Sequence, residues 1–289
     1  MNPVILRGLA PIVDRYEGFI LDVWGVLHDG ERPYPGVTTA LARLKVAGKR
    51  IVLLSNAPMR TPSVRDRLAG FGIGADLYDD ILTSGEEVWQ NLHDRADPFY
   101  AGLGHRCLWL GPQRHASMVS GLDLVLVDQP EQADFILNTG PDDLDEAATA
   151  FQPLLRTSAA LNLAMICANA DLHVMQGGDV IQCAGVLAKR YEDHGGVVRW
   201  HGKPFASVYH GCFRLLGGIA PAQILAIGDN IDTDIAGARG VGIDCALVAG
   251  GIHADRLERD GSGLPDAAAL EALCLGKASP NWVLPQLIW

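Results

Sequence analysis

The stretch that most constrains the fold is a short apolar run, Phe19 to Leu21, that ends in the carboxylate of Asp22. Such a run, followed by a glycine turn, predicts a buried parallel strand. Asp22 would then lie at the carboxyl edge of a sheet, where open α/β folds bind their ligands. Because an acid in this place also commonly caps the following helix, the role of Asp22 depends on what the other strand ends carry.

Length and composition limit the class of protein. A chain of 289 residues can bury a sizeable core in one large domain or two modest ones. Its 34 acidic and 23 basic residues give a net charge of −11. This balance argues against a broad surface for nucleic-acid polymers or anionic membranes, but not against a small anionic ligand held by local groups.

The cysteines and the apolar segments indicate in which cellular compartment the protein is expected. The six cysteines include no Cys-x-x-Cys pair, so we expect reduced core thiols and no zinc site. Residues 1–10 contain no long apolar segment, and no later apolar span reaches about 18 residues. We therefore expect a cytoplasmic protein without a membrane-spanning segment.

The two ends of the chain alternate short apolar strands with amphipathic helices. We expect a short helix within 4–17 and then strands at 19–22, 50–54, 81–84, 224–227 and 244–249. The helices expected between them begin near residues 37, 61, 85 and 205. This order predicts an α/β fold with a doubly wound parallel sheet. The tail 277–289, which holds two tryptophans, is expected to cross the core as a strap or to form a dimer contact.

The middle third indicates a second α/β unit. Asp97-Pro98 and residues 102–104 are typical of a linker, and Gly177-Gly178-Asp179 predicts a turn. Residues 196–200 are expected to return the chain to the main sheet. We expect further strands at 107–110, 124–127, 134–138 and 164–168, and a helix at 185–193. The predicted organisation is a core of residues 1–95 and 197–289 with an inserted cap domain of residues 96–196.

Polar side chains follow three of the expected strands of the core. Asp22, Ser55-Asn56 and Asp229 end these strands, Asp234 follows one turn later, and Lys203 lies in a turn before the fourth segment. Carboxylates close together need a cation between them, and oxygen ligands suit Mg²⁺. A hydroxyl, backbone N–H groups and an ammonium can hold phosphoryl oxygens, while a carboxylate can attack the phosphorus. The set therefore suits phosphoryl transfer.

These segments resemble, in order and over nearly the whole chain, the motifs of haloacid-dehalogenase-superfamily hydrolases. The large insertion before the lysine resembles class IIA of that superfamily, with its α/β cap of the C2 type. The matching segments are Asp22-Val23-Trp24-Gly25-Val26, Leu54-Ser55-Asn56, His201-Gly202-Lys203-Pro204 and residues 228–235. The resemblance implies a Rossmann-like core and a cap that closes over the site.

The resemblance also implies roles for single residues. It makes Asp22 the nucleophile and Lys203 the cation that neutralises phosphate. It places Gly25, Ser55, Asn56, Asn169 and Asp171 against the substrate. For Asn56, Asn169 and Asp171, a purely structural role in a turn is an open alternative. Relatives bind Mg²⁺ through groups that correspond to Asp22, the backbone carbonyl of Trp24 and Asp229, with Asp234 acting through water or holding the lysine.

Trp24 departs from the pattern of the phosphatases in this superfamily. They usually carry a second Asp at this position, which protonates the leaving group and then activates water. An indole has only an N–H donor and can do neither. His28 or Asp29, a few residues further on, are candidates to replace it. We therefore expect poor activity on alkyl phosphates and better activity on phosphates with good leaving groups.

The expected function is Mg²⁺-dependent hydrolysis of a small phosphate monoester, such as a sugar phosphate, nucleotide or aryl phosphate, through an aspartyl-phosphate. Relatives with this cap often pair through it, so a homodimer is one expected state. Two alternatives stay open. One is a phosphometabolite-binding protein with little turnover, which Trp24 favours. The other is a metal-free haloacid dehalogenase, in which Asp229 and Asp234 would have no evident purpose.

Overall fold

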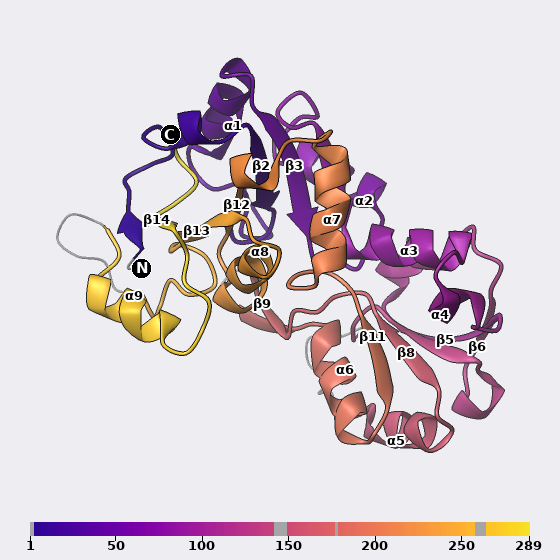
Figure 1. Ribbon diagram of the computed structural model, residues 1–289. Coiled ribbons are helices and arrows are strands. Elements are labelled where there is room, and N and C mark those ends of the chain that lie inside the picture. Colours follow the sequence, from indigo (N-terminus) through magenta and orange to yellow (C-terminus); the bar gives the residue numbers. More distant parts are fainter. Residues whose placement is uncertain (1–2, 142–148, 177–178, 258–263) are drawn as a thin grey trace.

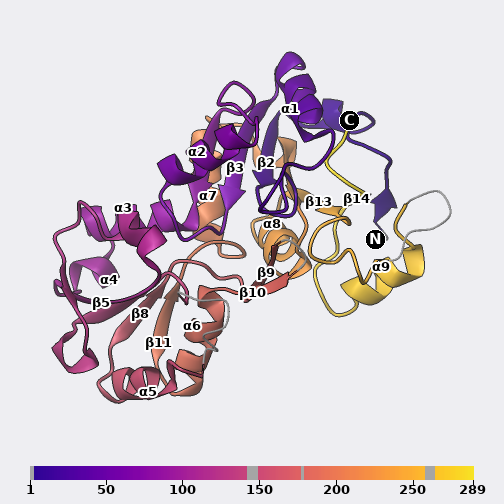
Figure 2. The same cartoon turned by 180° about the vertical axis from the view of Figure 1, so that it is seen from behind.

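The computed structural model describes residues 3–141, 149–176, 179–257 and 264–289. They form two α/β units, each built on a parallel sheet, and Figures 1 and 2 show these units side by side. The chain leaves the larger sheet after β4 (Asp80–Thr83) and re-enters it at β12 (Ile224–Gly228). The smaller unit is thus an insertion into the larger one.

The larger sheet has seven strands in the order β1-β14-β13-β12-β2-β3-β4, and all its neighbouring strands run parallel. Its other strands are β1 (Val4–Ile5), β2 (Gly18–Asp22), β3 (Arg50–Ser55), β13 (Asp244–Val248) and β14 (Trp282–Leu284). The strand order reverses direction around β2, which is the arrangement of a doubly wound fold. The predicted α/β fold class is confirmed.

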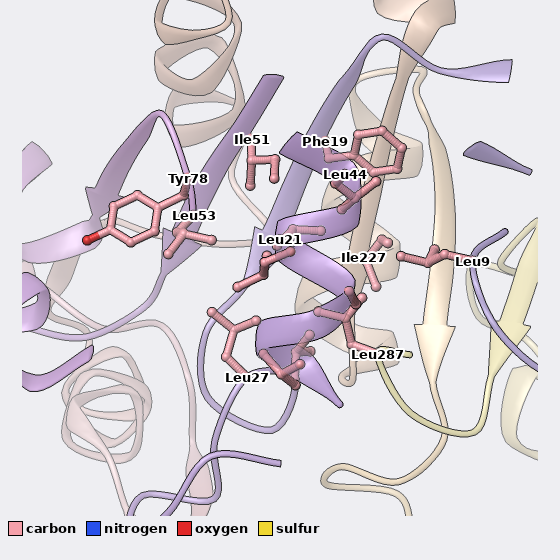
Figure 3. Packing of buried hydrophobic residues seen from close by; sticks show 14 of the residues in the cluster. Leu9, Phe19, Leu21, Leu27, Leu44, Ile51, Leu53, Tyr78, Ile227 and Leu287 are labelled. Carbon is pink, nitrogen blue, oxygen red and sulfur yellow. The ribbon is translucent and has the colours of Figure 1, made fainter. Parts of the chain in front are cut away.

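Helices cover both faces of this sheet. Figure 1 shows α7 (Ala206–Leu215) and α8 (Ala236–Gly240) in front of it, and Figure 2, seen from behind, shows α1 (Val37–Val46) and α2 (Thr61–Gly70). Alternate residues of β2 reach the two resulting cores. Phe19 and Leu21 pack with Leu44 of α1 (Figure 3), while Ile20 packs with α7. Burial on both faces explains why this strand is a continuous apolar run.

The smaller sheet has five parallel strands in the order β11-β8-β7-β5-β6. They are β5 (Arg106–Leu110), β6 (Val125–Val127), β7 (Phe135–Asn138), β8 (Ala164–Cys167) and β11 (Val197–Trp200). Helices α5 (Gln152–Ala160) and α6 (Ala184–Asp193) pack on one face, and α3 (Ser84–Asp94) and α4 (Pro98–Ala101) pack on the other.

An antiparallel hairpin, β9 (His173–Gln176) with β10 (Asp179–Gln182), leaves the smaller sheet. In both views it lies toward α8 of the larger unit (Figures 1 and 2). The turn expected at Gly177-Gly178 lies outside the described residues. The remaining elements are α9 (Ala267–Cys274), four 3₁₀ turns at Val13–Arg15, Gln113–Met118, Pro130–Gln132 and Pro221–Gln223, and a π-helical turn, η5, at Ile231–Ile235.

Two expectations about the main sheet are wrong. Residues 4–17 form a strand and one 3₁₀ turn instead of a helix, because Val4 and Ile5 pair with β14 and Pro11 interrupts the segment. Residues 197–200 do not return the chain to the main sheet, since β11 pairs with β8. The division into core and cap stays a proposal, and the pairing of β11 favours a second boundary just after Trp200.

The carboxy-terminal tail crosses the larger unit, as the strap interpretation predicts. Strand β14 lies between β1 and β13, so 244–249 is not the last strand of the sheet. Leu287 is fully buried in the same cluster as Leu9 and Leu27 (Figure 3). The tail is therefore part of the core of the larger unit. Within the described residues, the structure contains no helix that is both long and apolar enough to cross a membrane.

We expect Leu287→Ala to lower the free energy of unfolding by about 2–5 kcal/mol, because it removes a fully buried side chain and leaves a cavity. The matched control is Leu275→Ala, whose side chain is 82% exposed, with an expected change below about 0.5 kcal/mol. Urea denaturation measures both. Equal effects of the two substitutions would show that the tail is not part of the core.

Candidate active site

Three neighbouring strands deliver the predicted polar groups to one edge of the larger sheet. Asp22 is the last residue of β2, Ser55 is the last residue of β3, and Asp229 directly follows β12. Because β12, β2 and β3 are adjacent and parallel, their carboxyl ends meet. All three side chains are buried, and all line one cavity. The structure therefore brings together residues that lie more than 200 positions apart.

Lys203 enters the same cluster from the loop after β11. Its Nζ donates to Asp22 Oδ1 at 2.5 Å and to Asp234 Oδ1 at 2.7 Å, and its side chain is only 4% exposed. Asp234 lies on the π-helical turn η5, where its second oxygen accepts from the N–H of Asn230. Of the two roles considered for Asp234, these contacts favour holding the lysine.

Asn56 fixes the backbone of that lysine. Its Oδ1 accepts from the N–H of Lys203 at 2.7 Å, and its Nδ2 donates to the Lys203 carbonyl at 3.1 Å and to Asp171 Oδ1 at 3.0 Å. Asn169 accepts from the N–H of Asp171 through its own Oδ1. These contacts favour the structural alternative for Asn56 and Asn169. Asp171 lines the cavity as well, so it remains a candidate for substrate contact.

The electrostatics of the cluster call for additional positive charge. Burial raises the pKa of Asp22 well above its usual range, and the nearby Asp234 adds to this effect. Burial and Asp234 likewise raise the pKa of Asp229. Burial alone would lower the pKa of Lys203, but Asp22 and Asp234 raise it, so the lysine stays charged. Three buried carboxylates therefore face one ammonium.

This donor set fits a divalent metal ion. Asp22, Asp229 and Asp234 each offer a carboxylate oxygen, and these oxygens lie within 4.8 Å of one another. All are hard oxygen ligands, which Mg²⁺ and Ca²⁺ prefer. A dication would offset the excess negative charge. Asp229 is held in place by the N–H of Ile252, which donates to its Oδ2 at 2.7 Å.

Gly25 allows this close arrangement. Its φ of +85° lies in the left-handed region, and a Cβ at this position would come within 2.0 Å of Asp229 Oδ2. A residue with a side chain would displace Asp229. The structure thus gives Gly25 a steric role beside the acids, and it also lines the cavity as expected for a residue near the substrate.

Trp24 lines the cavity directly beside Asp22. Its indole meets the His28 ring edge to face, with 5.3 Å between ring centroids, and Arg67 lies 5.4 Å from the indole centroid. Burial lowers the pKa of His28 to about 4, and His28 Nδ1 accepts from the N–H of Gly30. His28 is therefore neutral at pH 7 and a poor substitute for an acid. Asp29 is not among the residues that line the cavity, and its Oδ1 accepts from two backbone N–H groups of its own turn.

The cavity has a volume of about 510 Å³, which is typical of a site for a small metabolite. Both units line it. The larger unit contributes the acids, Ser55 and Tyr34, while the smaller unit contributes Thr139 and the hairpin residues Val174 and Ile181. Ser55 Oγ accepts from the N–H of Ala57, and its own hydrogen remains a donor toward the cavity.

Sequence reasoning missed several lining residues. Arg67 on α2, Arg114 in the 3₁₀ turn Gln113–Met118 and the β9–β10 hairpin all contribute to the cavity. Of these, only the hairpin could have been predicted from the sequence, since Gly177-Gly178 separates two short polar–apolar segments. The two arginines lie outside every motif, and their approach to the site follows from the packing of the units.

Comparison with known families is consistent with this geometry. Residues 19–125 match the family model of haloacid dehalogenase-like hydrolases, and residues 200–273 match a model described as HAD-hydrolase-like. The matched ranges include Asp22, Ser55, Lys203 and Asp229. They do not extend over residues 126–199, which form much of the smaller unit.

Two curated proteins resemble the chain over most of their length. It is 26% identical over 240 residues to the sugar-phosphatase AraL of Bacillus subtilis, which covers 81% of this chain and 83% of that protein. It is 28% identical over 274 residues to chronophin of Homo sapiens, which covers 88% of each chain. The similarity therefore includes the inserted unit as well as the larger one.

Two solved structures share the whole fold. A possible sugar phosphatase from Cytophaga hutchinsonii superposes with a TM-score of 0.76 at 20% identity, over 98% of each chain. A hydrolase of the haloacid dehalogenase-like family from Brucella suis superposes with a TM-score of 0.84 at 31% identity, over 98% of this chain and all of that one. Taken with the two family matches, this similarity shows that the chain belongs to the haloacid dehalogenase-like hydrolases.

Proposed function

We propose that the protein is a Mg²⁺-dependent phosphatase that hydrolyses a small phosphate monoester through an aspartyl-phosphate on Asp22. One observation carries this proposal. The Lys203 ammonium lies between Asp22 and Asp234 at the inner end of a cavity that also holds Asp229. A nucleophile, a fixed cation and oxygen ligands for a metal are thus within reach of one phosphoryl group.

The names of the relatives support the substrate class. Besides the sugar-phosphatase AraL, a D-glycerol 3-phosphate phosphatase of Mycobacterium tuberculosis is 25% identical over 257 residues. A 4-nitrophenylphosphatase of Schizosaccharomyces pombe is 33% identical over 96 residues. The volume of about 510 Å³ suits a substrate of this size better than a phosphoprotein.

In the proposed reaction, an oxygen of Asp22 attacks the phosphorus and the bond from phosphorus to the ester oxygen breaks. The leaving oxygen takes up a proton from solvent water. A water molecule then attacks the phosphorus of the aspartyl-phosphate, the bond from phosphorus to the Asp22 oxygen breaks, and the water's proton passes to solvent, which releases phosphate and restores Asp22. Lys203 binds a phosphoryl oxygen and keeps the Asp22 carboxylate oriented. Ser55 and the backbone N–H groups after β2 and β3 would donate to the other oxygens.

The metal ligands proposed here are Asp22, the backbone carbonyl of Trp24 and Asp229. Asp234 would act on the metal through water while it holds Lys203. When bound, the ion supplies positive charge that offsets the repulsion between phosphate and carboxylates. In the glycerol phosphate phosphatase of Mycobacterium tuberculosis, which shares the fold at 19% identity, the solved structure contains calcium. A hard divalent ion is thus compatible with this fold.

Trp24 sets the proposed limit on this activity. It occupies the position where a second carboxylate would protonate the leaving group, and the low pKa of His28 leaves the neighbouring imidazole unprotonated. Leaving groups of low pKa need little protonation, so aryl phosphates should be better substrates than alkyl phosphates. Trp24 also favours the second candidate function, a phosphometabolite-binding protein with little turnover. The three clustered acids argue against a metal-free dehalogenase.

With p-nitrophenyl phosphate as the substrate, we expect phosphate release that requires Mg²⁺ and stops with EDTA. Asp22→Asn should lower kcat by roughly 10³-fold or more, since it removes the nucleophile. The matched control is Asp232→Asn, because Asp232 lies between Asp229 and Asp234 in the sequence but is exposed and paired with Lys277. It should retain the activity of the wild type.

The same assay separates the alternatives. Binding of the phosphate ester without Mg²⁺-dependent release would favour the binding protein. Release of halide from a 2-haloacid without Mg²⁺ would favour the dehalogenase. Undiminished hydrolysis by Asp22→Asn would show that Asp22 is not the nucleophile.

Restoring an acid at position 24 tests the limit set by the indole. We expect Trp24→Asp to raise kcat on glycerol 3-phosphate by about 10²–10⁴-fold, the usual contribution of general acid catalysis. The gain on p-nitrophenyl phosphate should be much smaller, because its leaving group has a low pKa. Trp24→Asn removes the same indole without adding an acid. Equal activity of the two variants on glycerol 3-phosphate would refute the argument.

A further inference from the structure

The cavity extends from the acids to two arginines that the proposed chemistry does not use. Arg67 comes from α2 of the larger unit, and Arg114 comes from the 3₁₀ turn Gln113–Met118 of the smaller unit. Both residues line the same cavity as Asp22 and Lys203. The two units thus each contribute an arginine to the lining of this cavity.

The surroundings of Arg67 differ from those of its neighbours on or beside α2. Arg60 forms an ion pair with Glu86 at 2.7 Å, and Arg65 lies 3.9 Å from Asp80. Arg67 forms no ion pair with any residue that the structure describes, and its guanidinium lies over the face of Trp24, 5.4 Å from the ring centroid. Arg67 is an exposed residue, but partial desolvation of its guanidinium lowers the pKa of Arg67, and the positive charge of Arg114 lowers it further.

Four acids among the described residues that line the cavity have partners other than Arg67. Asp22 and Asp234 bind Lys203, Asp171 accepts from Asn56, and Asp229 accepts from Ile252. In a protein with a net charge of −11, Arg67 is therefore a cation that faces the cavity, and Arg114 lies close enough to repel it. The planar donor fork of a guanidinium matches a carboxylate or phosphate group.

We infer that Arg67 and Arg114 form a second anion-binding subsite, so that the substrate is a phosphate monoester that carries another carboxylate or phosphate group. This inference rests on the proposed function, which assigns the phosphate that is cleaved to Asp22 and Lys203. The subsite selects among phosphate esters by the charge of the rest of the molecule. Trp24, whose indole centroid lies 5.4 Å from Arg67, lines the same cavity.

Matched substrate pairs test the inference. The carboxylate arm compares 3-phosphoglycerate with glycerol 3-phosphate, and the phosphate arm compares fructose 1,6-bisphosphate with fructose 6-phosphate. The measured quantity is the ratio of kcat/KM within each pair. We expect the wild type to favour the member with the second anionic group in at least one arm, by about tenfold or more, as charge-assisted hydrogen bonds provide. The arm that shows the larger ratio identifies the second group.

Arg67→Gln and Arg114→Gln should each lower this ratio toward one, and Arg67→Lys should lower it partly, because it keeps the charge but loses the fork. The control is Arg65→Gln on the same helix, whose side chain does not line the cavity. It should keep the ratio of the wild type. Because Arg67 and Arg114 lie on different elements, misfolding of one variant leaves the other as an independent test.

The outcomes separate this inference from the proposed function. Hydrolysis of p-nitrophenyl phosphate with no preference in either arm would overturn the subsite and leave the phosphatase intact. A preference that survives in both glutamine variants would also overturn it. If no phosphate is released from any substrate, calorimetric titration of the same pairs into the wild type decides the matter. Tighter binding of the more anionic member, lost in Arg67→Gln, would then support the subsite without the phosphatase.

Discussion

The interaction on which the site depends is the buried contact of the Lys203 ammonium with Asp22 and Asp234. Removing the lysine would leave two carboxylates buried without a counter-charge, which is costly in a region shielded from water. Other groups hold the pair in place: Asn56 binds the backbone of Lys203, and Tyr209 donates to the carbonyl of Asp234. The acids still outnumber the ammonium, so the site is suited to a cation and, beside it, to a phosphate group.

The two units are connected through this same region, so catalysis and substrate choice are linked in the structure. Asn56 of the larger unit donates to Asp171 of the smaller one. Ser84 Oγ, at the start of α3, lies 3.3 Å from the carbonyl oxygen of Ala57 in the larger unit and 2.6 Å from that of Ala168 in the smaller one. These contacts fix the smaller unit over the acids. They also set the distance from Asp22 to Arg114, which belongs to the smaller unit. Under the proposed function, the length of a suitable substrate therefore depends on how the units pack.

Sequence reasoning succeeded where the local pattern and the fold agree. Phe19 to Leu21 is apolar because helices cover both faces of β2, and this pattern is visible without a structure. It failed where a segment's structure depends on pairing with a strand far away in the sequence. Residues 4–5 form a strand because β14, nearly 280 residues later, offers an edge. Likewise β11 joins β8 in the smaller sheet, and nothing in its own sequence distinguishes this pairing from a return to the larger one.

The sequence by itself determined the fold class, the family resemblance and the residues at the strand ends, because these are local patterns read along the chain. Asp22, Ser55, Lys203 and Asp229 could all be named in this way. Only the tertiary structure decided that Asp234 holds the lysine, that Asn56 binds its backbone, and that Arg67 and Arg114 line the same cavity. The physical reason is that these contacts join side chains from elements far apart in the sequence. Their meeting depends on how two sheets pack, which no single segment encodes.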